Sequence, residues 1–351
     1  MKALVIGGTG FLGYHASLEL LGRGHTVTAL GVPPEPPGDL LPPGITVLMR
    51  DITQTTDPEL VQLLSGYEVV VFAAGADDRA TPPSPAASFF YEANVRSSVR
   101  VTAAALRAGV HRVVILGSYF SYFDRLWPEM ALAERHPYIS SRKQQLELSM
   151  AVAGDAMAVV VLELPYIFGS MPGARPLWTP LVNYVRSGVP LIYPRGGSNM
   201  VAVSRVAQAI GGACERINES RVFQVGDRNT TWTEFLQALC AIVGREDDTV
   251  HIIERASLNR LGWVMDALHA MKGLEGGLHS KHFADLMVAE AFFDPAESQA
   301  ALGYGTGGLQ QAWIDTVAAA PANVMFGNWK TFAERIPRII RRKRGNGRTP
   351  D

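Results

Sequence analysis

The sequence contains few cysteines and lacks any long uninterrupted apolar run. Cys214 and Cys240 are its two cysteines among 351 residues, and they give neither a disulfide framework nor zinc-site spacing. We expect both to be buried small apolar residues in a reducing compartment. No stretch reaches the roughly 18 apolar residues that a membrane-spanning helix needs, and the N-terminal run "ALVIGG" is no secretory signal. A cytoplasmic protein is therefore expected.

The charge is nearly balanced but unevenly distributed. Formal net charge is −1, yet residues 335–351 hold seven Arg/Lys against one Asp, which gives this tail +6 and the remainder −7. Ile336, Ile339 and Ile340 recur there at helical spacing, which slightly favours a weak peripheral contact with an anionic lipid surface. A solvated tail fits equally well. Nothing else in the chain suggests nucleic-acid binding.

Apolar, β-branched runs alternate with helical patterns through the first two thirds of the chain. The predicted strands cover residues 2–8, 25–31, 45–50, 68–75, 112–118 and 158–165, and the predicted helices cover 11–24, 57–67, 92–110 and 140–152. This alternation predicts right-handed βαβ crossovers and an α/β fold, a doubly wound parallel sheet of the Rossmann type. Strands rich in Val, Ile and Leu fit burial on both faces.

The pattern becomes irregular, aromatic and broken by Gly and Pro after about residue 165. We therefore divide the chain into three parts. Residues 1–165 are expected to form a dinucleotide-binding domain, 166–330 a small substrate-binding region interleaved with the sheet, and 331–351 the basic tail.

The segment "GGTGFLG" lies directly between the first predicted strand and the first predicted helix. Gly7 permits a tight turn, Gly10 lets the backbone approach a pyrophosphate, and Gly13 lets the helix pack on the strand. The helix N-terminus then turns its N–H groups and positive dipole end toward the phosphates. Placement this early in an alternating α/β chain makes the signal strong. The candidate cofactor residues here are Gly7, Thr9, Gly10, Phe11, Leu12 and Gly13.

Selectivity between NAD and NADP stays open. The second strand ends at Gly31, where NAD-binding folds usually present an acidic side chain to the ribose, and no arginine follows to hold a 2′-phosphate. After the third strand, Asp51 and Ile52 are candidates for the adenine edge. A solvated strand-end aspartate is an equally good interpretation of Asp51.

The segments "GGTGFLG", "DI", "AAG", "NV", "LGS" and "PYISSR" occur in this order and resemble the extended (atypical) short-chain dehydrogenase/reductase superfamily. The resemblance covers nearly the whole chain. Its ending, "FFDPAESQAALGY", is similar to NAD-dependent epimerase/dehydratase and 3β-hydroxysteroid-dehydrogenase-like members. The resemblance implies a bound nicotinamide dinucleotide, a Ser–Tyr–Lys active site, and a homodimer formed through two long helices of each subunit.

Several roles follow from the resemblance alone. Ser118 falls at the serine that orients the substrate, and Asn94 at the helix asparagine that supports the site's water and lysine. The remaining cofactor-binding candidates that the resemblance supplies are Ala73, Ala74, Gly75 and Pro165.

The segment "PYISSRKQQLE" departs from the family pattern. Residues four apart share a helix face, whereas residues five apart diverge by roughly 140°. Tyr138 and Arg142 therefore point together, and we expect Lys143 to form a solvated ion pair with Glu147 instead. A fixed cation lowers the pKa of a phenol, and the guanidinium can also hold ribose hydroxyls. Tyr138 and Arg142 are thus the predicted catalytic pair, with Arg142 also a cofactor ligand.

The predicted substrate is a hydrophobic hydroxy or keto compound, such as a polyketide, lipid or steroid-like molecule. Glu163 stands where sugar-nucleotide members usually carry an arginine, which argues against a nucleotide-linked sugar. Five side chains are expected to line an apolar pocket: Phe168, Met171, Leu177, Trp178 and Tyr193. A non-redox cyclase, dehydratase or epimerase, or a cofactor-binding protein without turnover, are the alternatives to an oxidoreductase.

The histidines give no metal site. His279 and His282 form H-x-x-H, but no third ligand accompanies them at suitable spacing. His136 precedes Tyr138, and we expect it to be a surface residue.

Overall fold

Seven parallel strands form the central sheet of the protein, whose computed structural model describes residues 1–322. Their order is β10-β6-β5-β4-β1-β2-β3. The strands are β1 (Lys2–Ile6), β2 (Thr26–Gly31), β3 (Ile45–Met49), β4 (Val69–Phe72), β5 (Arg112–Ser118), β6 (Ala158–Leu164) and β10 (Arg221–Gln224). The predicted doubly wound parallel sheet is confirmed, and all six predicted strands lie in it. The predicted basic tail lies outside the described residues.

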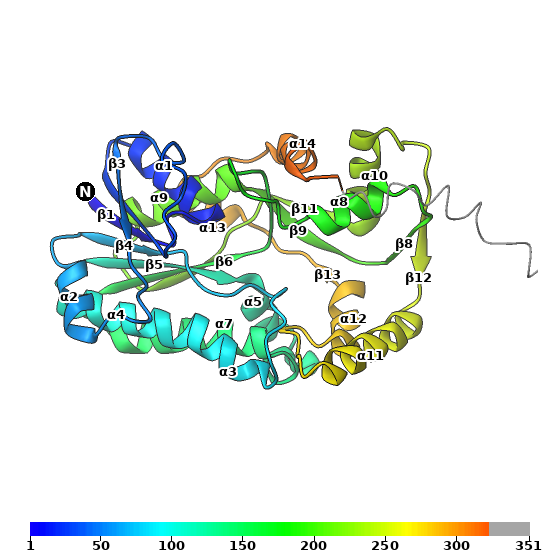
Figure 1. Ribbon diagram of the computed structural model, residues 1–351, viewed down its shortest axis with the longest axis horizontal. Helices are drawn as coiled ribbons and strands as arrows, with labels where there is room; N and C mark the ends of the chain where they lie inside the picture. Colours follow the sequence, from blue (N-terminus) through cyan, green and yellow to red (C-terminus); the bar gives the residue numbers. More distant parts are fainter. Residues whose placement is uncertain (323–351) are drawn as a thin grey trace, which may run out of the picture.

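Helices cover both faces of this sheet (Figure 1). Ala3 and Val5 of β1 point into one apolar core, whereas Leu4 and Ile6 point into the other, as the two-residue period of a strand requires. The first core is closed by α1 (Phe11–Gly22), α9 (Val203–Arg216) and α13 (Ala296–Leu302), and the second by α2 (Asp57–Leu64), α4 (Ser97–Arg107) and α7 (Pro137–Ala153). Burial on both sides explains why the strands are almost purely apolar.

The strand order reverses between β1 and β4. From this point β2 and β3 continue in one direction and β5, β6 and β10 in the other. The crevice beyond the carboxyl ends of strands at such a reversal is where open α/β sheets bind ligands. The segments that end β1, β4 and β5 therefore form the candidate site.

A second group of elements packs beside the carboxyl ends of the main sheet (Figure 1). Its strands are β7 (Tyr166–Phe168), β8 (Leu191–Pro194), β9 (Gly197–Ala202), β11 (Arg228–Thr231), β12 (Val250–Ile253) and β13 (Glu290–Ala291). Its helices are α8 (Thr179–Arg186), α10 (Trp232–Val243), α11 (Arg255–Met271), α12 (Ser280–Val288) and α14 (Leu309–Ala319). The rings of Phe168, Phe235 and Trp313 pack in its core in edge-to-face and tilted arrangements. In the sequence, α9 and β10 lie between elements of this second group, yet α9 packs on the main sheet and β10 is its edge strand, so the two parts are interwoven.

Two helical regions border the candidate site. The predicted helix over 92–110 begins earlier, with α3 (Ala86–Phe90), and passes through a π-helical turn, Tyr91–Arg96, into α4. After β5 the chain forms α5 (Tyr119–Leu126), a 3₁₀ turn (Pro128–Met130) and α6 (Leu132–Arg135) before α7. A π turn inserts one residue into a helix and often marks a functional site.

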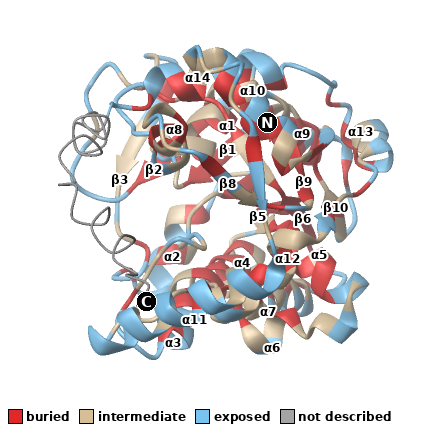
Figure 2. Cartoon of the chain, turned by 90° about the vertical axis from the view of Figure 1, so that its right-hand side faces the viewer, coloured by how far each residue is buried: buried red, intermediate tan, exposed pale blue. Residues whose placement is uncertain are grey.

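Burial follows these layers (Figure 2). Buried residues lie along the sheet and on the inner helix faces, and Cys214 and Cys240 are buried free thiols, as predicted. Across residues 1–322, no helix combines the length and the apolar character needed to cross a membrane.

Candidate active site

The glycine loop forms a tight turn between β1 and α1. Gly7 has φ +82°, and a Cβ there would lie 2.7 Å from the carbonyl oxygen of Ala73, so the loop touches the end of β4. A Cβ on Gly13 would overlap the Gly7 carbonyl, which makes glycine necessary there. At Gly10, by contrast, the one neighbour within 4 Å of a Cβ would be the Gly7 oxygen, at 3.3 Å. Gly10 therefore faces open space at the N-terminus of α1, where the free N–H groups of the first turn lie.

The end of β2 has no room for an acidic side chain. A Cβ on Gly31 would lie 2.5 Å from the hydroxyl oxygen of Thr9, so the Thr9 side chain occupies the place where the usual carboxylate would begin. Beyond β3, one oxygen of Asp51 accepts hydrogen bonds from the N–H and hydroxyl of Thr53, at 2.8 and 2.7 Å. Ile52 is buried in the core. One oxygen of Asp51 thus stabilises its own turn.

The π turn places Asn94 between the end of β4 and α7. Its side chain is fully buried; the oxygen accepts from the N–H of Ala76 at 2.8 Å, and the amide nitrogen donates to the hydroxyl of Ser141 at 3.0 Å. Gly75 has φ +130°, and a Cβ there would come within 2.5 Å of the Asn94 oxygen. Asn94 therefore holds the backbone after Ala73 and Ala74 in a shape that only glycine permits at the next position.

Ser118 ends β5 and begins α5. Its hydroxyl oxygen accepts a hydrogen bond from the N–H of Phe120 at 3.3 Å, as an N-cap does. The hydroxyl of Ser121 donates to the Ser118 carbonyl at 2.6 Å and fixes the corner. A capping serine keeps its own proton for donation. Pro165, another predicted site residue, lies buried directly after β6 at the same edge of the sheet.

Tyr138 and Arg142 lie on the same face of α7, as their spacing predicts. The Arg142 guanidinium carbon is 5.2 Å from the centre of the Tyr138 ring. Arg142 donates to the carbonyl of Leu116 at 3.3 Å and to that of Ala76 at 3.1 Å, so it joins α7 to the ends of β5 and β4.

The Arg142 side chain is buried, and a further bond of 2.9 Å joins it to the Gln145 side chain. Its Nε is buried and has no hydrogen-bond partner. Within residues 1–322 no carboxylate forms an ion pair with this guanidinium. Its positive charge is therefore available to a ligand or to the tyrosine.

The expected pair of Lys143 with Glu147 is wrong. The Lys143 ammonium lies 2.9 Å from a carboxylate oxygen of Asp124 on α5. Asp124 is almost buried, so an ion pair there is less screened by water than an exposed pair along one helix. The hydrogen bond to Asp124 raises the pKa of Lys143. Lys143 thus fastens α5 to α7.

Asp78 is a titratable residue near the end of β4 that sequence reasoning did not single out. It follows β4 in the segment "AAGADDR", and its side chain is 26% exposed. Burial raises the pKa of Asp78, and the cations Arg79 and Arg142 oppose that rise. The Nε of Arg79 lies 3.9 Å from the Asp78 carboxylate. The sequence does show two adjacent aspartates, Asp77 and Asp78, shortly after a central strand, and this pair was the available signal.

A strap formed by residues 273–279 closes over the N-terminus of α7. The Gly277 carbonyl accepts from the Tyr138 N–H at 3.0 Å. The Glu275 carboxylate accepts from the N–H of Ala86 at 3.0 Å and from the side chains of Ser84 and His279, each at 2.8 Å. No pattern in the sequence announces this contact, since the partners lie about 190 positions apart.

His136 is buried rather than at the surface, which corrects the expectation. Its Nδ1 accepts from the N–H of His279 at 3.0 Å and so anchors the strap. Burial, with the nearby His279 and His282, lowers the pKa of His136 to about 3, which keeps it neutral. Among residues 1–322, no three His, Cys, Asp or Glu side chains are placed to hold a metal ion.

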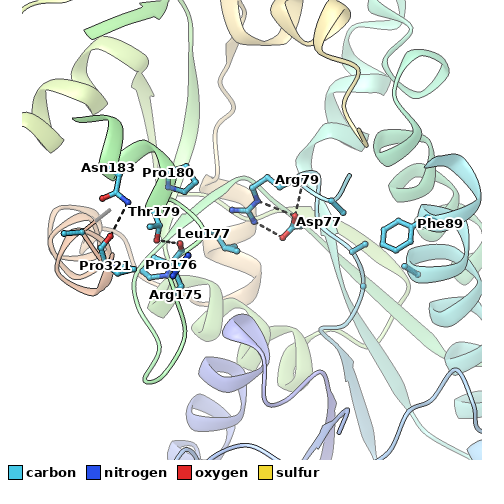
Figure 3. A pocket seen from close by; sticks show the side chains of 15 residues that line it. Asp77, Arg79, Phe89, Arg175, Pro176, Leu177, Thr179, Pro180, Asn183 and Pro321 are labelled. Atoms are coloured by element: carbon cyan, nitrogen blue, oxygen red, sulfur yellow. Dashed lines mark hydrogen bonds and ion pairs between the residues drawn. The ribbon is translucent and has the colours of Figure 1, made fainter. Parts of the chain in front are cut away.

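A cavity of about 980 Å³ opens between the two parts of the protein (Figure 3). One wall comes from residues 75–80 with Phe89, and the other from the loop and helix at residues 175–183. A smaller cavity of about 180 Å³ adjoins Phe11 of the glycine loop and shares Arg175 and Leu177 with the first. Between them, the two cavities border the glycine loop and the region beyond β4.

The predicted pocket residues separate into two groups. Met171, Leu177 and Trp178 line the smaller cavity. Phe168 and Tyr193 line neither cavity, which corrects their assignment: Phe168 is fully buried and stacks on Trp178 at 4.7 Å. Both side chains belong to the aromatic core of the second part of the protein.

Glu163 is fully buried in β6 and stabilises the active-site corner. One carboxylate oxygen accepts from the Ser121 hydroxyl at 2.7 Å, and the other from Arg125 and Gln224, each at 2.7 Å. The Ser121 hydroxyl has one proton, which it shares between the Glu163 carboxylate at 2.7 Å and the Ser118 carbonyl at 2.6 Å, so the carboxylate acts on Ser118 through one intervening residue.

A doubly wound parallel sheet with a glycine loop and a tyrosine–cation pair at its carboxyl edge defines a dinucleotide-binding α/β protein. The profile described as "NAD dependent epimerase/dehydratase family" matches residues 3–226. The chain belongs to this NAD-dependent family. No curated protein matches it by sequence.

Solved structures share this fold at low sequence identity. Gox2253 is 20% identical with a TM-score of 0.74, and the match covers 91% of this chain and 97% of that chain. UDP-N-acetylglucosamine 4-epimerase from Bacillus cereus is 14% identical with a TM-score of 0.64, and the match covers 90% of this chain and 95% of that chain. Bordetella bronchiseptica WbmH, solved in complex with NAD+, is 14% identical with a TM-score of 0.65, and the match covers 91% of this chain and 97% of that chain. These likenesses support the fold.

Proposed function

We propose that the protein is an NAD(P)-dependent oxidoreductase in which Tyr138 and Arg142 replace the family's tyrosine–lysine pair. The observation that carries this proposal is the Arg142 guanidinium, buried 5.2 Å from the Tyr138 ring and bonded to backbone carbonyls rather than to a carboxylate. A buried cation without a counter-ion is costly for the fold, which favours a functional reason for keeping it.

The residues present fit a dinucleotide. Gly10 leaves open space at the N-terminus of α1, and that terminus carries no acidic residue in its first turn to repel a phosphate. The unbonded Nε of Arg142 is a donor suited to a ribose hydroxyl. A bound nicotinamide dinucleotide would supply or accept the hydride.

The chain's own residues handle the proton and the orientation. In the reductive direction the carbonyl oxygen takes a proton from the Tyr138 hydroxyl, and the Ser118 hydroxyl donates a hydrogen bond to the same oxygen. The permanent charge of Arg142 stabilises the phenolate that remains. Because arginine does not titrate, reprotonation of Tyr138 requires another group.

A hydrophobic hydroxy or keto compound is the proposed substrate. Pro176, Leu177 and Pro180 form one side of the larger cavity, and Phe89 the other (Figure 3). Glu163 stands where sugar-nucleotide members usually carry an arginine, and its carboxylate is bound to Ser121, Arg125 and Gln224, so this position supplies no cation for a sugar nucleotide.

Epimerisation of a nucleotide-linked sugar is the second candidate, favoured by Arg175. This arginine lines both cavities and forms no ion pair among the described residues. Arg79, in the opposite wall, is neutralised by Asp77 at 2.9 Å. A free cation beside a cavity can hold a phosphate. The structural neighbours include MoeE5 solved with UDP-glucuronic acid and NAD.

One set of measurements tests both candidates. Calorimetry with NAD(H) and NADP(H) comes first, followed by nicotinamide absorbance with apolar alcohols and ketones and by product analysis with UDP-sugars. Turnover of an apolar alcohol or ketone that is lost in Tyr138→Phe supports the proposal. Epimerisation that fails in Arg175→Ala through a raised KM would favour the second candidate. Absence of any dinucleotide binding would contradict both.

A homodimer through α4 and α7 is part of the proposal. Leu148 and Val152 lie one turn apart on α7 and are exposed, and so are Phe89 and Tyr91, which precede α4 in the sequence. Leu148→Asp is expected to reduce the mass measured by light scattering to that of one chain.

A further inference from the structure

Within residues 1–322, Gln145 is the one side chain that accepts a hydrogen bond from the Arg142 guanidinium. Tyr138, Arg142 and Gln145 follow one another on α7 at spacings of four and three residues. At about 100° per residue these spacings place all three within roughly 60° of one helix face. The face of α7 that carries the candidate active site therefore continues to a fully buried glutamine.

Three acceptors fix the Arg142 guanidinium, and all of them are electrically neutral. Nη1 donates to the Gln145 side-chain oxygen at 2.9 Å and to the Leu116 carbonyl at 3.3 Å, and Nη2 donates to the Ala76 carbonyl at 3.1 Å. The Gln145 bond is the shortest of the three. Without it, one buried N–H of Nη1 would lose its acceptor, and the guanidinium would be less firmly held beside the Tyr138 ring.

The amide group of Gln145 is an unfavourable choice for stability alone. Arginine has only donors, so the amide oxygen must face it and the amide nitrogen must point elsewhere. That nitrogen is buried and donates to no described residue, which is destabilising. An apolar side chain would avoid this unpaired donor, and a glutamate would neutralise the guanidinium. Glutamine instead supplies an acceptor and leaves the positive charge intact.

We propose that Gln145 is the positioning residue that lets an arginine act in place of the family's lysine, because it holds the guanidinium beside Tyr138 without neutralising it. This inference rests on the proposed function. A lysine ammonium carries its donors on one atom, whereas a guanidinium spreads its donors over a planar fork, so a buried arginine needs more acceptors around it. The requirement for Gln145 should therefore disappear when Arg142 is replaced with lysine.

Calorimetry with NAD(H) and NADP(H) tests the positioning without a known substrate. Gln145→Met keeps a long side chain but has no amide. It should weaken binding of the dinucleotide that the parent binds about tenfold or more, because a hydrogen bond to a charged group is lost and the guanidinium is no longer aimed at the ribose. Thermal melts of the free variants check that each one folds.

Gln144→Met is the matched control for this variant. Among the described residues, the amide nitrogen of Gln144 donates to the Ser140 hydroxyl of its own helix, at 3.1 Å, and Gln144 has no contact with the guanidinium. The control should bind the dinucleotide as the parent does. Dinucleotide affinity of Gln145→Met equal to that of the parent would overturn the proposal.

Gln145→Glu separates position from charge. Beside a cation the new carboxyl group is ionised, so it keeps an acceptor for Nη1 but neutralises the guanidinium. Dinucleotide affinity should stay close to that of the parent, while kcat for the apolar alcohol or ketone that the parent turns over should fall about tenfold or more. This variant keeps the hydrogen bond, so it also provides the test should Gln145→Met not fold. Retention of both affinity and kcat would give Gln145 a structural role only and overturn the proposal.

A comparison in the Arg142→Lys background shows whether Gln145 acts through the arginine. There, Gln145→Met should change dinucleotide affinity little, because the ammonium does not need this acceptor. Losses that multiply, as for independent sites, would show that Gln145 acts apart from Arg142 and would overturn the proposal. A parent that binds neither dinucleotide would contradict the proposed function itself. Parent binding together with a normal Gln145→Met would contradict this inference alone.

Discussion

The Lys143 ammonium lies 2.9 Å from Asp124, while the neighbouring Arg142 guanidinium stacks on the Tyr138 ring at 5.2 Å. Two adjacent cations on one helix thus have different roles. Lys143 fastens α5 to α7, and Arg142 lies in the candidate active site. The assignment of the family's lysine position to Arg142 depends on this separation.

The first prediction concerns these roles. Tyr138→Phe should lower turnover by about 10²–10⁴-fold and keep cofactor affinity, because only the proton donor is lost. Arg142→Ala should lower both turnover and cofactor affinity, whereas Arg142→Lys should restore part of each.

Lys143→Ala is the control for this pair. It should cost some stability through Asp124 but leave kcat and cofactor affinity close to those of the parent. Steady-state kinetics and calorimetry on the four variants provide the check. Severe loss in Lys143→Ala with normal Arg142→Ala would place the catalytic cation one residue later.

The second prediction addresses the glycine loop. Gly10→Val should abolish dinucleotide binding and leave the melting temperature nearly unchanged, because the new side chain would enter the open space before α1. Gly13→Val should unfold the loop instead, since its Cβ would overlap the Gly7 carbonyl. Gly22→Ala, with no atom within 4 Å of its Cβ, is the control. Calorimetric titration with NAD(H) and thermal melts distinguish the two effects, and full affinity in Gly10→Val would remove the phosphate role of this loop.

The sheet was predictable because its signals are local. A continuous run of β-branched residues is itself the mark of a strand that is buried on both faces of a parallel sheet. The glycine motif likewise lies within seven consecutive residues at the end of one strand. The pairing of Tyr138 with Arg142 was equally accessible from helix geometry. Contacts between distant segments were not accessible. The strap at Glu275 and the Lys143–Asp124 pair depend on how separate helices pack, and the exposure of His136 could not be judged without that packing.

The third prediction concerns the buried carboxylate of Glu163. Arg125→Ala should destabilise the fold by about 2–4 kcal/mol, because the buried Glu163 carboxylate would then keep only neutral hydrogen-bond donors, Ser121 and Gln224. Glu163→Gln should cost less, about 1–2 kcal/mol, since Arg125 is 42% exposed and can turn to water.

The double variant Glu163→Gln/Arg125→Ala should be more stable than Arg125→Ala alone, because the buried negative charge of Glu163 is then absent. Urea midpoints measure all three. Arg96→Ala, which removes an exposed pair with Glu92, should change stability by no more than about 0.5 kcal/mol. An Arg125→Ala variant as stable as this control would show that the buried carboxylate needs no cation.

The last prediction follows from the strap. Burial raises the pKa of Glu275, but hydrogen bonds from the Ala86 N–H, His279 and Ser84 outweigh it and leave the pKa lowered. A carboxyl group whose folded pKa is depressed stabilises the fold above its unfolded pKa of about 4.3 and loses that contribution as the pH falls through the folded pKa. The strap should therefore loosen progressively as the pH falls below about 4.3.

Glu275→Gln should remove this pH dependence and cost about 1–2 kcal/mol of local stability at pH 7. Hydrogen exchange of the Ala86 and Tyr138 amides measures it directly, because each donates to the strap, at 3.0 Å. Protection in the parent should exceed that in Glu275→Gln at pH 7, and the difference should vanish in acid. The exposed Glu129→Gln should behave as the parent at every pH. A difference that persists unchanged into acid would mean that the Glu275 charge does not hold the strap on the helix that carries Tyr138.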